Sequence, residues 1–319
     1  MAIIYGIPDS ELEILRMAPR HIKNFEDIDK EHKNLKNNLA QEKKVFFEKV
    51  PSRIVEEEQN LEKMKTHEKI TEDEFNEKLK NLEKKKTEGG FTGFSASFKG
   101  FIVKNYSKKR AIKKIKNQQD KQESHIKEWK ENPEGIFNIE QKETISEIKE
   151  FDELKEDPFY AGAKGELDVL KKLSQLSDDY HVLCGVRIDL GRYVTYRGRK
   201  NLRSAQMDFV VVSKRGVILI EVKNWSRGYS KNYEGLSPHE QVDRAGMVLW
   251  IELQSWRSPR NPSIASVLLS VRGNMEYDYR YKFVKVKNLN NINYFIENRN
   301  EQFTDNEVKR VVDRLKKYL

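Results

Sequence analysis

The sequence predicts an α/β domain with one mixed sheet, preceded by an α-helical coiled-coil module. Residues 10–87 have helical periodicity and almost no glycine, whereas glycine, β-branched residues and tyrosine become common from Asp157 onwards. After that point the predicted order is helix, several strands, helix and further strands, which is typical of a sheet covered by helices. We therefore divide the 319 residues into a helical module, 1–156, and a globular domain, 157–319.

The helical module is predicted from apolar residues that recur at spacings of 7 and 4 between Lys and Glu side chains. Pro51 interrupts this seam and is expected to end or kink one helix. Lys, Asn and Gln fill gaps in the seam, so a long parallel dimer is not assured. We expect a helical hairpin or bundle that self-associates into a homo-oligomer. The seam residues are Ile28, Leu35, Leu39, Phe46, Val50, Ile54 and Leu61.

A segment rich in glycine and phenylalanine, residues 89–101, is predicted to break the helix. The helical pattern resumes at about 103–130 and, after a stop at 132–135, at about 139–155. We expect the aromatic side chains of the 89–101 segment to pack back onto the helices. The alternative is that they contact a protein partner.

The composition limits the classes of protein to which the chain can belong. Its net charge is +9, and residues 156–319 carry 28 Lys/Arg against 20 Asp/Glu, an excess that attracts polyanions such as nucleic acid or an anionic membrane face. The single cysteine, Cys184, excludes an internal disulfide framework and a cysteine-based zinc cluster. The N-terminus has no secretory pattern, and no apolar window approaches the roughly 20 residues of a spanning helix. We therefore expect a cytoplasmic protein without a membrane partner.

Two apolar runs in the globular domain predict adjacent strands. The run 209–212 follows Asp208, and after a short polar turn the run 216–220 precedes Glu221 and Lys223. Side chains alternate along a strand, so Glu221 and Lys223 project to the same side. Pairing of the two strands would bring Asp208 to the same place.

Two carboxylates beside one lysine are suited to the hydrolysis of phosphodiesters. Mg²⁺ and Mn²⁺ prefer oxygen ligands, and we expect Asp208, Glu221 and the carbonyl of Val222 to bind one of these ions. Lys223 would orient or help deprotonate the attacking water and offset phosphate charge. Ordinary ion pairs at strand ends are the alternative, and the two flanking apolar strands favour the metal site.

Two further polar residues are candidates for this site. Glu166 lies in a predicted helix, 161–176, where Gly165 permits close approach of another backbone. A carboxylate favoured by the helix dipole in the first turn is the alternative interpretation of Glu166. Gln241, near the start of a predicted helix at 238–256, is expected to hydrogen-bond a phosphate or the metal-bound water, or else to be an exposed polar residue.

A basic segment precedes the Asp208 strand. Residues 189–203 are predicted to form a polar loop or hairpin, in which cations would bind phosphates and tyrosines would stack on unpaired bases. The alternative interpretation of this segment is a hairpin tip that is exposed to solvent and does not contact the substrate. Trp225 is a further candidate for substrate contact, or it packs on a helix. The cations are Arg192, Arg197, Arg199, Lys200 and Arg203.

These motifs resemble those of the nuclease-related domain, NERD, a branch of the PD-(D/E)xK nuclease superfamily. The resemblance covers roughly residues 160–275, and the N-terminal 155 residues lie outside it. It implies a restriction-endonuclease-like core with a mixed sheet flanked by helices, and Mg²⁺- or Mn²⁺-dependent cleavage of nucleic acid. It also implies an active-site set of Glu166, Asp208, Glu221 and Lys223, with Gln241 as an accessory. The matching elements are Gly162-x-x-Gly165-Glu166, Met207-Asp208-Phe209-Val210-Val211, Gly216-Val217-x-x-Ile220-Glu221-Val222-Lys223-Asn224-Trp225 and Pro238-x-x-Gln241.

The sequence therefore predicts a metal-dependent nuclease, with DNA favoured over RNA as substrate and defence or DNA repair as the context that the resemblance suggests. The alternative is a non-catalytic nucleic-acid-binding or scaffolding protein that combines a nuclease fold with a helical self-association module. The intact acidic pair and lysine argue against that alternative. A helical interaction protein with an incidental basic domain is a third interpretation.

Overall fold

The computed structural model describes residues 1–319 except 88–89, 225–235, 255–261 and 274, together with the side chains of residues 90–94. The chain forms two compact units, one made of Met1–Lys30 with Glu150–Leu319 and the other of Glu31–Lys149. We call them the globular unit and the helical unit. The sequence predicts a helical module over residues 1–156, whereas residues 1–30 and 150–156 cluster with the globular unit.

A six-stranded mixed sheet forms the centre of the globular unit, in the spatial order β1-β2-β3-β4-β5-β6. The pairs β2/β3 and β3/β4 are antiparallel, and β1/β2, β4/β5 and β5/β6 are parallel. The prediction of a mixed sheet is therefore confirmed. The strands are β1 (Ile3–Tyr5), β2 (His181–Tyr196), β3 (Arg199–Ser213), β4 (Gly216–Lys223), β5 (Ile264–Ser270) and β6 (Val284–Asn288).

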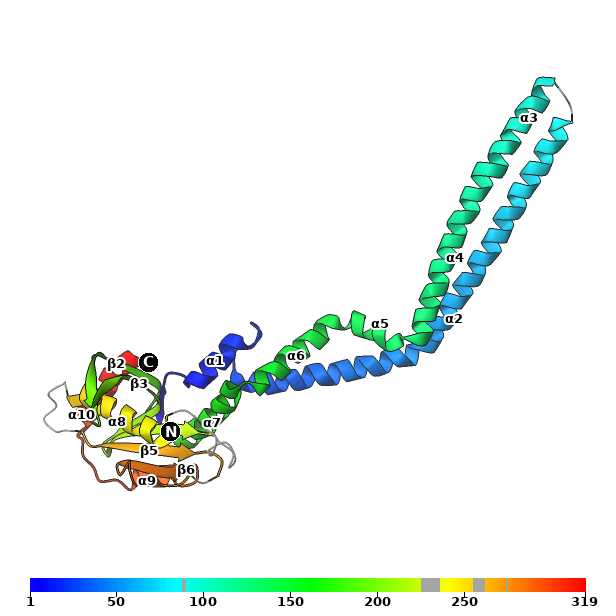
Figure 1. The fold of residues 1–319 in the computed structure, drawn as a ribbon. Coiled ribbons are helices and arrows are strands. Elements are labelled where there is room, and N and C mark those ends of the chain that lie inside the picture. The colour runs from blue at the N-terminus through cyan, green and yellow to red at the C-terminus, as the bar shows by residue number, and fades with distance from the viewer. Residues whose placement is uncertain (88–89, 225–235, 255–261, 274) are drawn as a thin grey trace. The chain divides into compact units, whose positions relative to one another are not determined.

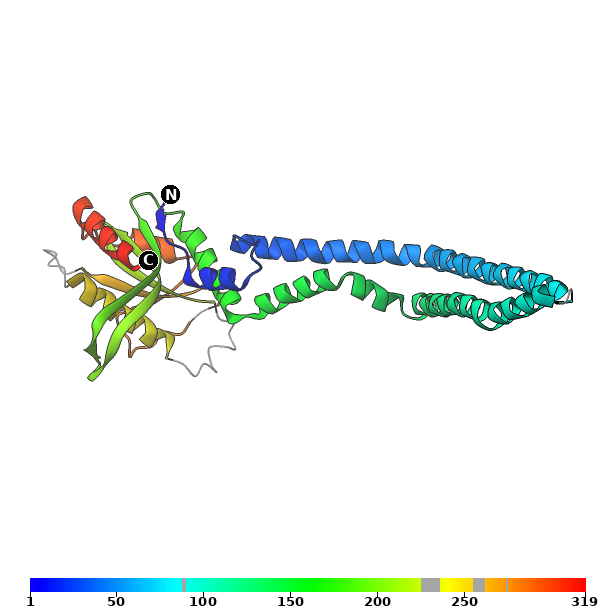
Figure 2. The same cartoon turned by 90° about the horizontal axis from the view of Figure 1, so that it is seen from above.

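Strands β2 and β3 form one long hairpin, which Figure 2 shows as the pair of green arrows that extends beyond the other strands. Its two-residue turn consists of Arg197 and Gly198, both with positive φ, at 46° and 80°. Such a turn matches the twist of antiparallel strands and favours glycine at the second position. The predicted polar loop or hairpin is therefore a hairpin.

Helices cover both faces of the sheet (Figure 1). On one face α7 (Pro158–Leu173) and α9 (Ile292–Glu297) pack against Ile218 and Ile220 of β4. On the other face α8 (Pro238–Gln254) and α10 (Asp305–Leu315) pack against Leu219. Seven of the eight residues of β4 are consequently buried, which places the end of this strand in a dry environment.

One segment among the further strands predicted after the second helix, residues 291–296, is helical instead. It forms most of α9, in which Ile292 and Ile296 are both fully buried. Their spacing of four residues is the helical period, and short apolar runs do not by themselves distinguish strand from helix.

The N-terminus of the chain adds to the globular unit. Strand β1 pairs in parallel with β2, and α1 (Asp9–Met17) packs against α7. No helix of the described residues is long and apolar enough to cross a membrane.

The helical unit is built on an antiparallel hairpin of α2 and α4, which lie side by side in both views (Figures 1 and 2). Ion pairs join Lys108 to Glu72 at 3.0 Å and Lys130 to Glu58 at 2.6 Å, so residue numbers rise along one helix as they fall along the other. The prediction of a helical hairpin is confirmed. The elements are α2 (Phe25–Lys86), α3 (Gly90–Ile102), the π-helical turn Val103–Ser107, α4 (Lys108–Glu131), α5 (Pro133–Glu140) and α6 (Lys142–Glu156).

Pro51 was expected to end or kink one helix; it lies inside α2, which continues to Lys86 and bends partway along its length (Figure 1). A proline removes one hydrogen bond of the helix, at a cost of about 3 kcal/mol. Packing near this position offsets that loss: the Phe46 ring stacks on Trp129 with centroids 5.5 Å apart and meets Phe137 edge-on at 5.3 Å.

The predicted break over 89–101 is also wrong from Gly90 onwards, because this segment forms α3. A glycine inside a helix costs only about 1 kcal/mol relative to alanine. Burial of Ala96 on the hairpin stabilises the helix here. Phe98 and Phe101 are 61% and 58% exposed, so these two side chains do not pack back onto the helices as expected.

Candidate active site

The two predicted metal-binding acids lie where β3 and β4 separate. The antiparallel ladder ends at the pair Phe209–Ile220, and Asp208 and Glu221 are the next residues on the two strands. The backbone N–H of Val222 donates a hydrogen bond of 2.7 Å to Oδ2 of Asp208. The Asp208 carboxylate thus takes the place of the next backbone acceptor and is held against the end of β4.

Lys223 is tied to the same place. Its Nζ donates to Oε1 of Glu221 at 2.9 Å, and the side chains are only 15% and 3% exposed. The two residues are separated by one position on the same strand, so the predicted projection to a common side is confirmed. A buried carboxylate with a lysine partner therefore stands beside a second carboxylate.

The backbone carbonyl of Val222 faces this site as well. In a strand, the N–H and C=O of one residue point toward the same neighbouring strand. The Val222 N–H points to Asp208, so its C=O also points to the side of β3, beyond the last paired residues. This direction suits the role that the sequence predicts for the carbonyl as a metal ligand.

Glu166 of α7 contributes a third carboxylate, which is buried like that of Glu221, whereas Asp208 is partly exposed. The helix begins at Pro158 with Asp157 as N-cap, so Glu166 lies in the third turn and not in the first turn as predicted. The helix dipole falls off within one turn and does not account for a carboxylate here. Glu166 is 6% exposed and accepts hydrogen bonds from Oγ and the backbone N–H of Ser10, at 2.6 and 3.2 Å.

Gly165 lets α7 approach the end of β4. A Cβ on this residue would lie 2.7 Å from Cβ of Asn224, closer than side chains tolerate. The Asn224 side chain in turn donates to the carbonyl of Ala161 at 2.6 Å. The expected close approach at Gly165 therefore occurs, and it fixes α7 next to the strand that carries Glu221 and Lys223.

Burial raises the pKa of all three carboxyl groups, and neighbouring carboxylates add to the rise at Asp208 and Glu166. Burial, followed by the negative charges of Glu221 and Glu166, raises the pKa of Asp208 well above its ordinary value. Burial raises the pKa of Glu221, although the Lys223 ammonium opposes this change. Burial raises the pKa of Glu166 to about 7; the Ser10 hydrogen bonds lower it, and the charges of Asp9 and Glu221 add to the rise. A bound divalent cation would stabilise the ionised forms of such a cluster.

The donor set is a sparse one for a metal. Within the described part of the chain, no group of three or more His, Cys, Asp or Glu side chains is arranged to hold an ion. A metal at this site would therefore rely on the pair Asp208 and Glu221 with the Val222 carbonyl and water, a combination that suits Mg²⁺ or Mn²⁺.

Comparison with known families agrees with this site. Residues 161–269 match the model of the family described as NERD, nuclease-related domain. This segment is a nuclease-related domain. No curated protein matches the chain. The match includes Glu166, Asp208, Glu221 and Lys223 and confirms the resemblance found in the sequence, whereas Ser10 and the helical unit lie outside it.

Gln241 belongs to the nuclease-related domain but is not joined to the acidic cluster. It is half-buried in the first turn of α8, where its backbone N–H donates to the Ser237 carbonyl at 2.9 Å. Its side chain forms no hydrogen bond to the three carboxylates in the described part of the structure.

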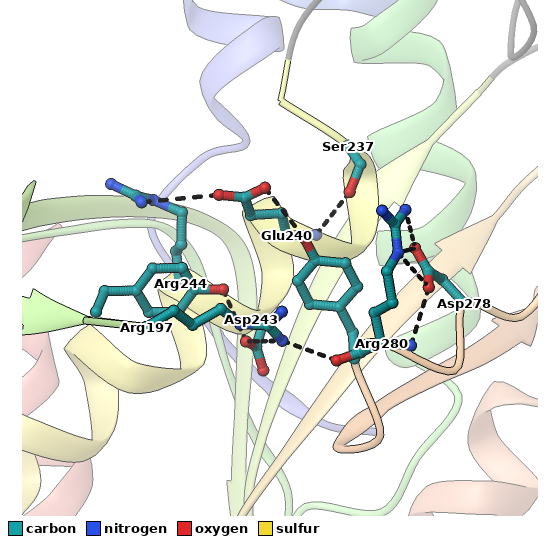
Figure 3. A network of polar contacts seen from close by, with 9 residues as sticks. Arg197, Ser237, Glu240, Asp243, Arg244, Asp278 and Arg280 are labelled. Atoms are coloured by element: carbon teal, nitrogen blue, oxygen red, sulfur yellow. Dashed lines mark hydrogen bonds and ion pairs between the residues drawn. The ribbon is translucent and has the colours of Figure 1, made fainter. Parts of the chain in front are cut away.

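Arg197, a predicted nucleic-acid contact on the hairpin of the nuclease-related domain, has structural partners within the globular unit (Figure 3). Its guanidinium donates to Asp243 of α8 at 3.2 Å and to the Arg280 carbonyl at 2.9 Å, and it lies 4.1 Å from the centroid of the Tyr281 ring. The Tyr196 hydroxyl donates to the same Asp243 carboxylate at 2.8 Å. These contacts fasten the hairpin tip to α8.

The other predicted contacts differ in their surroundings. Arg203 donates to Asp189 on the paired strand at 3.0 Å, with both side chains about half exposed. Arg192, Arg199 and Lys200 are exposed on the hairpin. Trp225 lies outside the described residues. The hairpin therefore offers three exposed cations, while Arg197 and Arg203 are engaged with carboxylates.

Ser10 is a site residue that the sequence analysis missed. It lies 156 positions from Glu166, and its segment was assigned to the helical module. The short apolar run Ile3-Ile4-Tyr5 before Pro8 was the available signal, because a strand there places the following residues beside the sheet.

Proposed function

We propose that the nuclease-related domain hydrolyses phosphodiester bonds of nucleic acid with the help of Mg²⁺ or Mn²⁺, and that DNA is its substrate. The proposal is supported above all by the convergence of Asp208, Glu221 and Lys223 where β3 and β4 separate, with a hydrogen bond from Lys223 to Glu221 and one from Val222 to Asp208.

The chemistry divides between the ion and the residues around it. Asp208, Glu221 and the Val222 carbonyl would hold the ion. When bound, a divalent metal polarises the scissile phosphate and lowers the pKa of an attacking water. The Asp208 carboxylate keeps its orientation through the Val222 N–H, so little reorganisation is needed on binding.

Lys223 and Glu166 would assist from two sides. The Lys223 ammonium, held by Glu221, orients the water and offsets negative charge on the phosphate. Glu166 has a pKa of about 7, so its carboxyl group exchanges a proton near neutral pH, as a general base or acid must.

Positive charge on the β2–β3 hairpin would hold the substrate. Exposed Arg192, Arg199 and Lys200 can contact phosphates, which gives binding without sequence preference. Tyr193 is 55% exposed and can stack on an unpaired base, whereas Tyr196 is buried and bonded to Asp243.

The test is cleavage by the full-length chain. Circular single-stranded DNA, circular duplex DNA and RNA would be incubated with Mg²⁺, Mn²⁺ or a chelator. We expect cutting only with the metals, and a loss on the order of a thousandfold in Asp208→Ala and Lys223→Ala, because each removes several kcal/mol of transition-state stabilisation. Lys285→Ala removes an exposed lysine from β6 and should cut like the wild type.

Two results would contradict the proposal. Folded wild-type protein that binds nucleic acid without cutting it, and whose binding is unchanged in the Asp208 and Lys223 variants, would indicate a docking function. Cutting that persists in both variants would mean that the hydrolysis takes place elsewhere.

A further inference from the structure

The end of the helical hairpin that includes α3 presents apolar side chains to solvent. Phe98, Phe101 and Ile102 of α3 are 61%, 58% and 39% exposed, and Tyr106 of the following π-helical turn is 67% exposed. Spacings of three and four residues place them along one helical face. The rings of Phe101 and Tyr106 meet edge-on, with centroids 6.4 Å apart. We call these four side chains the tip patch.

The tip patch is bordered by a high density of positive charge. Residues 78–119 contain 13 Lys/Arg and two Asp/Glu, so this stretch alone exceeds the +9 net charge of the whole chain. On α4 the side chains of Lys109, Arg110, Lys113 and Lys114 are exposed. A groove along α4 and the preceding turn has five lysines and one acid in its lining, which consists of Lys104, Lys108, Lys109, Ile112, Lys113, Lys116, Asn117 and Asp120.

Part of this charge is neutralised across the hairpin and part is not. Lys108 pairs with Glu72 at 3.0 Å, and Lys116 lies 3.7 Å from Glu68. Between Lys99 and Lys116 the sequence has eight cations and no acid, so most of the positive charge has no carboxylate within its own segment. The surface around the tip patch therefore suits a polyanion.

The combination of the two features distinguishes between polyanions. The apolar residues of the tip patch have cations before and after them in the sequence, at 84–86 and at 104–116. Amphipathic helices that bind a bilayer have such a composition, with Phe and Leu at the acyl boundary and flanking Lys and Arg at the lipid phosphates. Nucleic acid needs the cations but no isoleucine and phenylalanine surface. A second copy of the chain would bring like charges together.

We propose that the hairpin tip, residues 98–116, binds the surface of an anionic lipid bilayer. Phe98, Phe101 and Ile102 would enter the boundary between headgroups and acyl chains, and the lysines of α4 would contact lipid phosphates. The apolar stretch is far too short to span the bilayer, so the attachment is peripheral. This partner differs from the expectation of no membrane partner, and it does not depend on catalysis by the nuclease-related domain.

Co-sedimentation of the full-length chain with vesicles tests the proposal. Vesicles of phosphatidylcholine alone would be compared with vesicles that also contain phosphatidylglycerol, at low and high salt. We expect binding to the anionic vesicles that weakens with salt. The Phe98→Ser/Phe101→Ser variant should bind at least about tenfold more weakly, and Lys109→Gln/Lys113→Gln roughly fivefold more weakly per lysine.

Matched variants control for general effects of surface substitution. Ile70→Ser changes an apolar side chain of α2 that is 52% exposed, and Lys33→Gln/Lys44→Gln removes two exposed lysines of the same helix. Both should bind vesicles like the wild type. Circular dichroism would verify that all variants keep their helix content.

Several outcomes would overturn the proposal. One is absence of vesicle binding by the wild type, and another is undiminished binding by the tip variants. DNA binding that is lost in Phe98→Ser/Phe101→Ser, without vesicle binding, would assign the tip to nucleic acid. Lipid-independent self-association that the same variant abolishes, again without vesicle binding, would assign it to a second copy of the chain.

Discussion

Two lysine–glutamate pairs of similar length illustrate the difference between the two units. In the nuclease-related domain Lys223 and Glu221 are 2.9 Å apart with side chains 15% and 3% exposed. In the helical unit Lys43 and Glu134 are 2.6 Å apart with side chains 46% and 62% exposed. Lys43 lowers the pKa of Glu134, whereas burial raises the pKa of Glu221 in spite of Lys223. Burial, more than distance, decides what an ion pair does.

The same contrast extends to the surroundings of each pair. Strand β4 is covered on both faces, so the carboxylates at its end lack the water that would stabilise their charges. The hairpin of α2 and α4 exposes most of its charged side chains. Charge in the globular unit is therefore suited to chemistry, and charge in the helical unit to solubility and to contact with polyanions.

The largest expected effect is the loss of the buried cation. Lys223→Ala leaves Glu221 buried without its lysine and should lower the free energy of unfolding by about 3 kcal/mol at pH 7. Lys43→Ala should have an effect too small to measure, because its partner is solvated. Urea unfolding of metal-free protein measures both. Equal losses in the two variants would refute the contrast between the units.

The pH dependence of stability tests the raised pKa of Glu166. Its pKa is raised from 4.5 to about 7, so the folded state binds this proton more tightly than the unfolded state. The contribution of the Glu166 carboxyl group to the stability of the folded state is fully present below pH 4.5 and is lost as the pH rises through about 7. Glu166→Gln should therefore gain stability relative to the wild type over this range, by up to about 3 kcal/mol. Unfolding in chelator across that pH range measures the difference, and a constant difference would contradict it.

Loss of the hydroxyl that contacts Glu166 should have a smaller effect. Ser10→Ala removes the 2.6 Å hydrogen bond to a buried carboxylate and should destabilise the protein by about 1–2 kcal/mol. Ser52→Ala removes an exposed hydroxyl that bonds within α2 and serves as the control. Thermal unfolding of both variants measures the loss of stability. An unfolding midpoint of Ser10→Ala equal to that of the wild type would show that α1 is dispensable for holding Glu166.

The smallest effects are expected on the surface of the hairpin. Arg199→Ala and Lys200→Ala should each weaken DNA binding several-fold and reduce the slope of log affinity against log salt by about one. Arg203→Ala should change that slope less, because Arg203 is paired with Asp189. Binding titrations at several salt concentrations measure the slopes. Identical slopes for the three variants would mean that pairing on the hairpin does not restrict phosphate contact.

Local patterns in the sequence are sufficient for β3 and β4 and for the core of the site. An apolar run that precedes Glu221 and Lys223 predicts a strand, and the alternation of side chains places these two residues on the same side of it. The short turn before that strand predicts an antiparallel pairing with the strand that carries Asp208. The glycines of α3, where the sequence predicts a break, lie in a helix whose low local propensity is outweighed by packing within the hairpin.

The sequence thus predicts the antiparallel pairing of β3 and β4 and the approach of two acids to one lysine, because these features depend on residues close together in the chain. Tertiary structure alone decided that Ser10 contacts Glu166, that Arg197 pairs with Asp243, and that the pKa of each site carboxyl is raised. These features depend on which distant segments meet and on how much water they exclude, and no local pattern encodes either.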